Sequence, residues 1–518
     1  AKRQLLEVLL QFFENHFVTQ YSKSRDYFDQ FYDNANAESR IAAQFEYLEN
    51  NKWRAALLNP SGTFYDLLKI SAESPAMIIY LDTVTSKGNG SNIANENYAR
   101  ELLELFTFGV DNGYLQTDIT ILSRCWTGWT LQIVAPSSAA NPYALRTTNL
   151  LASSIAVGAT NFNVISNLAG VWAFNFNTNN HNTNSKTLFA NAVVPARFGP
   201  PYTTKFYGTN GVAGRYTLGI PSRKGTNGIQ DGYDVIQFFA NLPFTQEYLS
   251  VKLCQIFVHD DFQTGYDFTT NNLSEEGQLV KACMSSWENS NGQIRPVLAT
   301  IFQSELFRSH GGSLQKVKTP LEYMVSAVRV LRSSTNGTYN SGTFTADTDG
   351  YNLIGPISRA GSMGLFDRAE PNGYAEAGPP WISAGTLNER IRFVQAFMMI
   401  TNQPSYSAST KQDAGYNTTN SPVRLIVSKL PLASRTNAAA VADYFLGIIY
   451  PGEGAGNLDL YRTAAINFLN DGSADAAPSA FQFGSASVPF NTAPNSAYDI
   501  RVRGMVGLLL SFQRFHEQ

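Results

Sequence analysis

Charged residues are scarce in this chain of 518 residues, at 15% of the total, whereas soluble domains average roughly 25%. The signs nearly balance, with 38 Lys and Arg against 41 Asp and Glu and a net charge of −3. No basic cluster interleaves with aromatic residues, so we expect no nucleic-acid partner. No apolar run approaches the ~20 residues that a membrane-spanning helix needs, so we expect no membrane span.

Cysteine and histidine are also rare. The three cysteines are odd in number and widely spaced, which excludes a disulfide framework. We expect Cys125 and Cys254 to be buried thiols, while a Cys254–Cys283 bridge stays open. The five histidines leave few ligands for a metal site. The His-Glu-x-x-His, Gly-x-Ser-x-Gly, P-loop and Rossmann signatures are all missing. Whether the protein is an enzyme, and whether it has a metal or cofactor, therefore stays open.

Aromatic residues are abundant, at 13%, and hydrophobic residues reach 43%, which is ample for a packed core. A chain of this length predicts one large domain or two closely packed ones. A surface poor in charge and rich in Asn, Thr and Tyr suits an exported protein or a component of an assembly. We therefore predict an extracytoplasmic location, whether periplasmic, at the cell surface or secreted.

Apolar residues recur mostly at helical spacing, which predicts a mainly α-helical fold with a loop-rich, partly β insertion. Four blocks follow: helical residues 1–135, a loop-rich insertion at 136–230, a second helical part at 231–335, and a C-terminal helical part with Pro/Gly-rich loops at 336–518. In the insertion, residues 154–157 and 171–174 have strand-like composition. Later helices are expected at 233–241, 245–257, 275–286, 295–303, 320–332, 386–400, 438–449, 458–470 and 500–514.

The most informative stretch, residues 95–109, reads Asn-Glu-Asn-Tyr-Ala-Arg-Glu-Leu-Leu-Glu-Leu-Phe-Thr-Phe-Gly. At about 100° per residue its polar side chains share one face and its apolar side chains fill the rest, which predicts one deeply packed helix. Arg100 and Glu104 are spaced to pair, and Gly109 suits a helix end. A second helix is expected at 116–127.

This stretch, with Gly113-Tyr114 and Thr127-Gly128-Trp129 after it, resembles the pattern of the bacterial domain-of-unknown-function 1800 family. Further pieces resemble the family in the same order: Asn15-His16-Phe17, His181 with Lys186-Thr187-Leu188, residues 232–261, Lys318-Thr319-Pro320, Pro371-Asn372-Gly373-Tyr374 through Trp381, and residues 508–514. The resemblance thus spans almost the whole chain.

The chain departs from the family pattern in three places. Phe106 and Phe108 stand where the family often has His and Leu, which removes a metal ligand from this helix, and Asn182 replaces an acid. Family members usually carry an Arg-rich helical segment before Asn-His-Phe, and this chain begins close to that motif. We therefore expect a processed or missing front end.

The family has no assigned chemistry. Its bacterial members often carry export signals and are found beside sulfatase-like proteins, which implies work on polymers outside the cytoplasm or a part in a surface assembly. Our first hypothesis is a binding or structural component of such an assembly, with protein partners or a polysaccharide as ligand. The alternative is a secreted hydrolase, metal-assisted or not, that acts on a polymer.

The hydrolase hypothesis needs one site formed by His16, Arg100, Glu101 and His181. A histidine and a glutamate steered by an arginine can act as a general acid/base pair or contribute to a metal shell. The alternatives are a core histidine at His16, an exposed loop histidine at His181 and a structural arginine–carboxylate network on the helix. His516 is expected at the surface.

The binding hypothesis involves four further residues: Asn97, Trp129, Lys186 and Trp381. Asn97 lies on the polar face of the signature helix, and Lys186 follows His181 as in the family. The two tryptophans could form a platform for sugar rings, or they could belong to the core. Neither the ligand nor the oligomeric state follows from the sequence.

Overall fold

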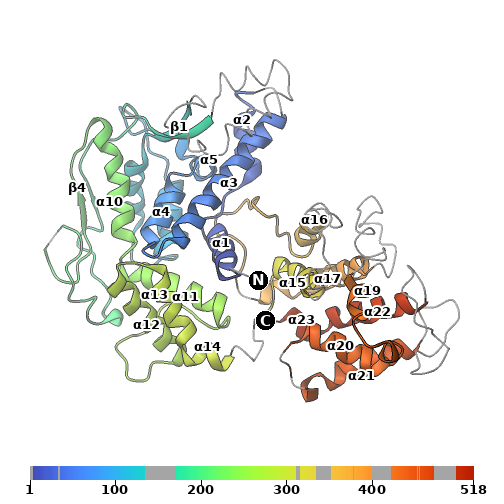
Figure 1. Ribbon diagram of the computed structural model, residues 1–518. Coiled ribbons are helices and arrows are strands. Elements are labelled where there is room, and N and C mark those ends of the chain that lie inside the picture. Colours follow the sequence, from blue (N-terminus) through green and yellow to red (C-terminus); the bar gives the residue numbers. More distant parts are fainter. Residues whose placement is uncertain are drawn as a thin grey trace. The chain divides into compact units, whose positions relative to one another are not determined.

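The computed structural model describes residues 4–32, 35–134, 171–209, 211–310, 316–333, 352–376, 378–398, 422–451, 453, 455–471 and 497–517. The chain divides into two compact units, which are described separately below (Figure 1). Unit 1 contains residues 1–312 and 366–374, and unit 2 contains residues 313–365 and 375–518. Both units are built mainly from α-helices, as the sequence predicts.

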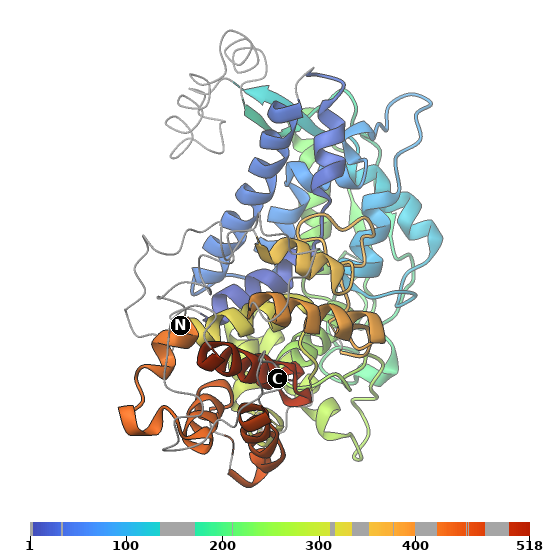
Figure 2. The ribbon, with the colours of Figure 1, turned by 90° about the vertical axis from the view of Figure 1, so that its right-hand side faces the viewer.

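The α-helices in the described part of unit 1 are α1 (Gln4–His16), α2 (Tyr21–Phe28), α3 (Ala35–Leu58), α4 (Phe64–Ala72), α5 (Pro75–Tyr80), α6 (Asn97–Glu101), α7 (Gln116–Ser123), α10 (Gln230–Phe239), α11 (Pro243–Phe257), α12 (Glu275–Ser290), α13 (Ile294–Gln303) and α14 (Glu305–His310). Local sequence fixes several of their ends. Thr63 and Asp66 form a capping box at the start of α4, and Asn291 ends α12 in the left-handed conformation with φ of 53°. Figure 2 shows the long α3 beside α2.

The signature helix differs from the prediction of one α-helix through residue 108. It is α-helical only in α6 and continues as the π-helix η2 (Leu102–Thr107). The Phe108 amide donates to the Leu103 carbonyl at 3.0 Å, and the Thr107 hydroxyl donates to the Leu102 carbonyl at 2.5 Å. Both bonds span five residues, so a wider turn replaces the α-helical one; such turns often occur at functional sites.

Two small antiparallel sheets lie among the described residues of unit 1. Strands β1 (Trp129–Val134) and β2 (Val171–Phe176) pair Trp129 with Phe176, and β3 (Lys186–Leu188) and β4 (Leu218–Ile220) pair Lys186 with Ile220. The strand predicted at 171–174 is therefore confirmed as part of β2, whereas the one at 154–157 lies outside the described residues.

The core of unit 1 is rich in aromatic residues. Phe17 stacks between Trp53 and Phe64, with ring centroids 5.8 and 6.0 Å away, and the Phe106 ring meets the Phe17 ring edge-on at 5.4 Å. All four rings are at most 1% exposed. The apolar side of the signature helix therefore packs against Phe17 and His16 at the end of α1, as its wide apolar arc predicts, and Phe17 continues the contact to α3 and α4.

The described part of unit 2 contains the α-helices α15 (Pro320–Ser333), α16 (Asn352–Arg359), α17 (Ala384–Phe397), α19 (Pro422–Val427), α20 (Ala438–Ile449), α21 (Asp459–Asp471), α22 (Ala497–Ser511) and α23 (Gln513–His516). Several of its polar groups are internal. Arg503 pairs with Asp499 at 2.9 Å, with both side chains 1% exposed. His516 is buried and stacks on Tyr323 at 4.8 Å, so its predicted surface position is wrong.

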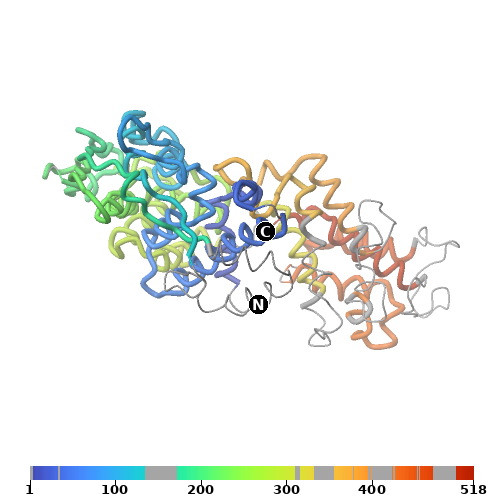
Figure 3. Tube along the Cα trace, turned by 90° about the horizontal axis from the view of Figure 1, so that it is seen from above, coloured from blue at the N-terminus to red at the C-terminus, as the bar shows by residue number. Residues whose placement is uncertain are grey.

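Residues 366–374 belong to unit 1 although unit 2 supplies the chain on both sides (Figure 3). Asp367 forms a β-bridge with Gln20. The Tyr374 amide donates to the Asn15 side-chain oxygen at 2.6 Å, and the Asn15 amide group donates back to the Tyr374 carbonyl at 2.8 Å. Gly373 has φ of +69°, and a Cβ there would lie 2.4 Å from the Asn15 carbonyl oxygen. Only glycine suits this junction.

The described part of the chain contains no helix with the length and apolar character required to cross a membrane. The expectation of no membrane span agrees with this finding.

Candidate functional site

Three family-like segments that are far apart in the sequence meet on one part of unit 1. They are the Asn15-His16-Phe17 motif at the end of α1, the signature helix, and the Pro371-Asn372-Gly373-Tyr374 loop. Polar side chains that surround their meeting point define what we call the motif face: Lys23, Tyr80, Asp82, Asn97, Glu101, Arg368 and Glu370.

A chain of polar contacts links α2, α5 and α6 on this face. Lys23 Nζ lies 2.9 Å from the Asp82 carboxylate and donates to the Tyr80 carbonyl at 2.7 Å. The Asn97 side chain donates to the other Asp82 oxygen at 3.2 Å. Lys23 and Asp82 keep 36% and 44% of their side chains exposed, and Asn97 is exposed. These groups are held in place but remain accessible to a partner.

The loop at 366–374 supplies the rest of the motif face. The Tyr80 hydroxyl donates to the Ala369 carbonyl at 3.0 Å, and Arg368 pairs with Glu370 at 3.1 Å. The Arg368 guanidinium lies 4.8 Å from the centre of the Tyr374 ring. Burial raises the pKa of Tyr80, and the negative charges of Glu101 and Glu370 raise it further. Both carboxylates therefore act on the same hydroxyl group.

Glu101 has the most perturbed carboxyl group of the motif face. Burial raises its pKa to about 7, the charge of Glu104 adds to the rise, and the charge of Arg100 opposes it. The side chain is half-buried and accepts no hydrogen bond from the described residues. A carboxyl group that titrates near neutrality can donate or accept a proton under ordinary conditions.

Arg100 has a different set of contacts. Its guanidinium lies 3.2 Å from Glu104 and 3.4 Å from Glu96, and it donates to Gln116 at 3.0 Å. The predicted Arg100–Glu104 pair is confirmed. Because Gln116 begins α7, Arg100 joins the signature helix to the next helix, a structural task.

His16 lies in the aromatic core, 2% exposed. Its Nε2 lies 3.1 Å from the Phe106 carbonyl and its Nδ1 lies 3.2 Å from Lys252 Nζ. Burial lowers its pKa well below the usual value, and the Lys252 charge adds to this effect, while the Phe106 carbonyl opposes it. A neutral ring that donates from Nε2 and accepts at Nδ1 satisfies both contacts.

His181 belongs to a buried ionic network. Its Nε2 lies 3.2 Å from Asp231, and Lys186 Nζ lies 2.7 Å from the same carboxylate oxygen. Arg223 pairs with the other Asp231 oxygen at 2.8 Å. The His181, Lys186 and Asp231 side chains are at most 1% exposed. Burial raises the pKa of Asp231, but hydrogen bonds from His181, Lys186 and Arg223 outweigh it and lower the value overall.

The four residues of the hydrolase hypothesis therefore have separate surroundings. Among the described residues, the hydrogen bonds and ring contacts of His16 share no residue with those of His181. Arg100 and Glu101 are neighbours on the signature helix, and Glu101 faces the motif face. Within the described ranges, no group of three or more His, Cys, Asp or Glu side chains is arranged to hold a metal ion. The catalytic role of these residues stays a prediction.

Of the four binding candidates, only Asn97 is exposed. Trp129 is 1% exposed and its ring packs 4.7 Å from Trp126. Trp381, in unit 2, is 4% exposed and donates to the Ala375 carbonyl at 2.9 Å. Lys186 is in the ionic network. Trp129 and Trp381 thus have core positions, the alternative that the sequence left open.

Sequence reasoning missed most of the motif face and a second set of acids. Glu14 on α1 and Glu46 and Glu49 on α3 form what we call the carboxylate cluster. Glu46 is 6% and Glu49 2% exposed. The sequence does indicate that Glu46 and Glu49 are buried, because residues 46 and 49 share the helical face of the apolar Trp53. No comparable pattern indicates the burial of Asp231.

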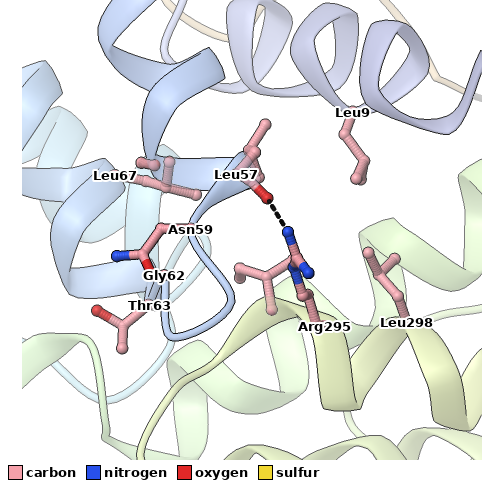
Figure 4. Close-up of a pocket in the computed structure, with 10 residues that line it drawn as sticks. Leu9, Leu57, Asn59, Gly62, Thr63, Leu67, Arg295 and Leu298 are labelled. Carbon is pink, nitrogen blue, oxygen red and sulfur yellow. Dashed lines mark hydrogen bonds between the residues drawn. The ribbon is translucent and has the colours of Figure 1, made fainter. Parts of the chain in front are cut away.

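A small pocket elsewhere in unit 1 lies between α1, the end of α3, α4 and α13 (Figure 4). Its empty volume is about 280 Å³, including space open to solvent. Leu9, Leu67 and Leu298 line much of it, and the Arg295 guanidinium donates to the carbonyls of Leu57 and Leu58 at 3.3 and 2.6 Å. Its charged group is thus engaged with the backbone, so this pocket offers little for chemistry.

All three cysteines are buried and free. The expectation of buried thiols at Cys125 and Cys254 is confirmed, and burial raises the pKa of both. Cys254 and Cys283 are hydrogen-bonded neighbours without a disulfide.

Comparison with known sequences identifies the family. The profile of a family described as "Protein of unknown function (DUF1800)" matches residues 1–448. No curated protein and no solved structure matches the chain. The matched range contains all of unit 1, with the three segments that meet at the motif face. Since the match covers most of the 518 residues, the chain belongs to the DUF1800 family.

Proposed function

We propose that this protein works outside the cytoplasm as a binding component of an extracytoplasmic or surface assembly, and that it meets its partner at the motif face. One observation carries the proposal: segments near residues 16, 97 and 372, each matched to the family pattern, converge on one accessible polar surface. The partner is a protein or a polysaccharide.

The character of this face supports binding. Lys23, Asp82, Arg368 and Glu370 offer both signs of charge within a small area, each oriented by an ion pair. Preformed side chains lose little conformational entropy when a partner binds, and mixed charges give specificity. The low charge content of the whole chain supports the extracytoplasmic location.

Cell fractionation tests the location, and a matched pair of variants tests the face. Lys23 and Arg25 both lie on α2 and both form exposed ion pairs, but only Lys23 contacts Tyr80. We expect Lys23→Ala to reduce retention in the envelope fraction at least about fivefold, the effect of losing about 1 kcal/mol at an interface. The Arg25→Ala variant should be retained in the envelope fraction as well as the unchanged protein is.

Two outcomes would contradict this proposal: a cytoplasmic location, or equal retention of both variants with unchanged circular dichroism. Glu370→Ala supplies a second variant that cannot unfold the chain easily, because 60% of that side chain is exposed. It should behave as Lys23→Ala does.

A secreted hydrolase is the second candidate, and the half-buried Glu101 favours it. With its pKa raised to about 7 mainly by burial, Glu101 would serve as general acid or base beside the Tyr80 hydroxyl. Turnover of nitrophenyl esters and glycosides should show an inflection near pH 7 and disappear in Glu101→Gln. Glu104→Gln should remain active with its inflection at lower pH, because the Glu104 charge contributes to the raised value.

The metal-assisted form of this hydrolase has its own test, mass spectrometry of metals in the natively purified protein. One transition-metal or calcium ion per chain would support it. A metal-free protein would leave only the acid/base form around Glu101.

A further inference from the structure

A second accessible feature of unit 1 is an open groove between the loop at 205–208, strand β4 and helix α10. It has an empty volume of about 780 Å³, including the space open to solvent, and none of its lining residues belongs to the motif face. Phe206, Tyr207 and Phe238 supply aromatic surface, and Gln237 and Asn241 supply amides.

The exposed aromatic ring of this groove stands on a fixed loop. Phe206 is 67% exposed. The preceding Lys205 amide donates to the Pro201 carbonyl at 2.9 Å, and the Lys205 carbonyl accepts from the Gly214 amide at 2.8 Å. The backbone beside Phe206 is therefore fixed, while the ring itself stays open to a ligand.

Gly208 holds the other end of the loop. Its φ is +59°, and a Cβ there would lie 2.0 Å from the Thr217 carbonyl oxygen. The Thr209 amide donates to that same oxygen at 3.1 Å. The loop therefore lies tight against the chain leading into β4, which sets the position of Phe206 before any ligand arrives.

The charges around the groove are already compensated. Lys205 pairs with Glu288. Asp234 accepts from Arg223 at 2.6 Å and from Gln230 at 2.9 Å. An anionic or cationic ligand would have to compete with these pairs, whereas a neutral ligand would leave them intact.

An uncommitted hydrogen-bonding group remains at the groove. Gln237 lines it and its side chain is exposed. The Gln237 amide can donate and accept, which matches the hydroxyl groups of a sugar.

We infer that this groove binds a neutral polysaccharide, with a sugar ring against Phe206 and its hydroxyl groups on the Gln237 amide. An aromatic ring covers the C–H face of a sugar, amides bond its hydroxyl groups, and an open groove admits a polymer chain that continues on both sides. The inference rests on the proposed binding function for its polysaccharide ligand, but it assigns that ligand to a surface separate from the motif face.

The test measures binding of the purified protein to insoluble cellulose and chitin, and to xylan and dextran by affinity electrophoresis. We expect retention by at least one of them. Phe206→Ala should weaken binding about tenfold, a loss of about 1.4 kcal/mol, because it removes the ring that covers the sugar. Gln237→Ala should weaken it less. Leu115→Ala is the matched control, because Leu115 is also exposed, at 69%, but lies outside the groove.

Each other result would overturn the inference. Equal binding by Phe206→Ala and the unchanged protein would place the ligand elsewhere while leaving the proposed binding function intact. Retention only by the acidic polymer polygalacturonate, lost in salt, would exclude a neutral ligand. No retention by any polysaccharide would show that this groove is not a glycan site. The proposed binding function would then depend only on the comparison of Lys23→Ala and Arg25→Ala in the envelope fraction.

Discussion

The carboxylate cluster predicts an unusual dependence of stability on pH. Glu14, Glu46 and Glu49 lie together in unit 1, where Asn50 donates to Glu14 at 3.2 Å and Thr19 donates to Glu46 at 2.9 Å. Burial raises the pKa of Glu14 to about 7 and that of Glu46 to about 8, with the Glu14 charge adding to the latter. It raises the pKa of Glu49 well above the usual range, with the Glu46 and Glu14 charges adding to the effect. All three groups are protonated in the folded chain at mildly acidic pH.

The sign of the effect follows from proton binding. In the unfolded chain these carboxyls titrate near 4.5, so between pH 4.5 and about 8 the folded state holds more protons than the unfolded state. Stability therefore falls as pH rises through this window and levels off once the folded groups have ionised. Ordinary acids with lowered pKa values show the opposite trend.

Glu46→Gln measures the size of this effect. Each tenfold change in proton affinity corresponds to about 1.4 kcal/mol, so a pKa moved from 4.5 to about 8 costs about 5 kcal/mol above pH 8 and about 3 kcal/mol at pH 7. Glutamine keeps the shape and can still accept from Thr19. The variant should match the parent at pH 5 within about 1 kcal/mol and exceed it by several kcal/mol at pH 8.

Urea unfolding at pH 5, 6, 7 and 8, followed by tryptophan fluorescence, measures this difference. Five of the six tryptophans lie in unit 1, so the signal reports mainly on that unit. Glu7→Gln is the control: Glu7 is also on α1, but it is 57% exposed and paired with Arg54, and its loss should cost at most about 1 kcal/mol at every pH. A parent protein that gains stability from pH 5 to 8, or a Glu46→Gln variant with no gain at pH 8, would refute the reasoning.

Two further predictions concern the framework of unit 1. Asp231→Ala should destabilise the unit by about 3–5 kcal/mol in urea unfolding, because it leaves Lys186 buried without its carboxylate partner; a loss below about 1 kcal/mol would show that the network is not needed. Gly373→Ala should lower the midpoint of thermal unfolding well below that of the Gly211→Ala variant. Both glycines have positive φ, but only at Gly373 would an added Cβ meet another atom. Equal midpoints for the two variants would contradict the proposed junction with Asn15.

Side-chain periodicity predicted the helices well because burial of one face dictates it. The helix at 438–449 was predicted with the bounds of α20, and the expected helix at 245–257 lies within α11. The π-helix at 102–107 was not predictable in this way. It depends on which carbonyl each amide reaches, and over six residues the apolar pattern does not distinguish the two turns.

The site was harder to predict because its parts come from distant segments. The sequence identified Lys186 and His181 but not Asp231, whose carboxylate binds both, since the acid follows them by 45 or more residues. For His16 it left open a site with Arg100 and Glu101 or a core position; the ring has the core position and bonds the backbone of Phe106. A one-dimensional pattern gives the helix face of a residue without giving its partner.

The structure nevertheless divides the polar residues of the family motifs into two kinds. Three of them form hydrogen bonds inside unit 1: Asn15 with the Tyr374 backbone, His16 with the Phe106 carbonyl and Lys186 with Asp231. A role in folding is enough to explain their presence in the motifs. Glu101 has no such partner among the described residues, and its half-buried carboxyl is costly for the fold because burial disfavours its charge. A motif residue that does nothing for stability is best explained by a partner or substrate, which is why the motif face, rather than either histidine, is the place to look for function.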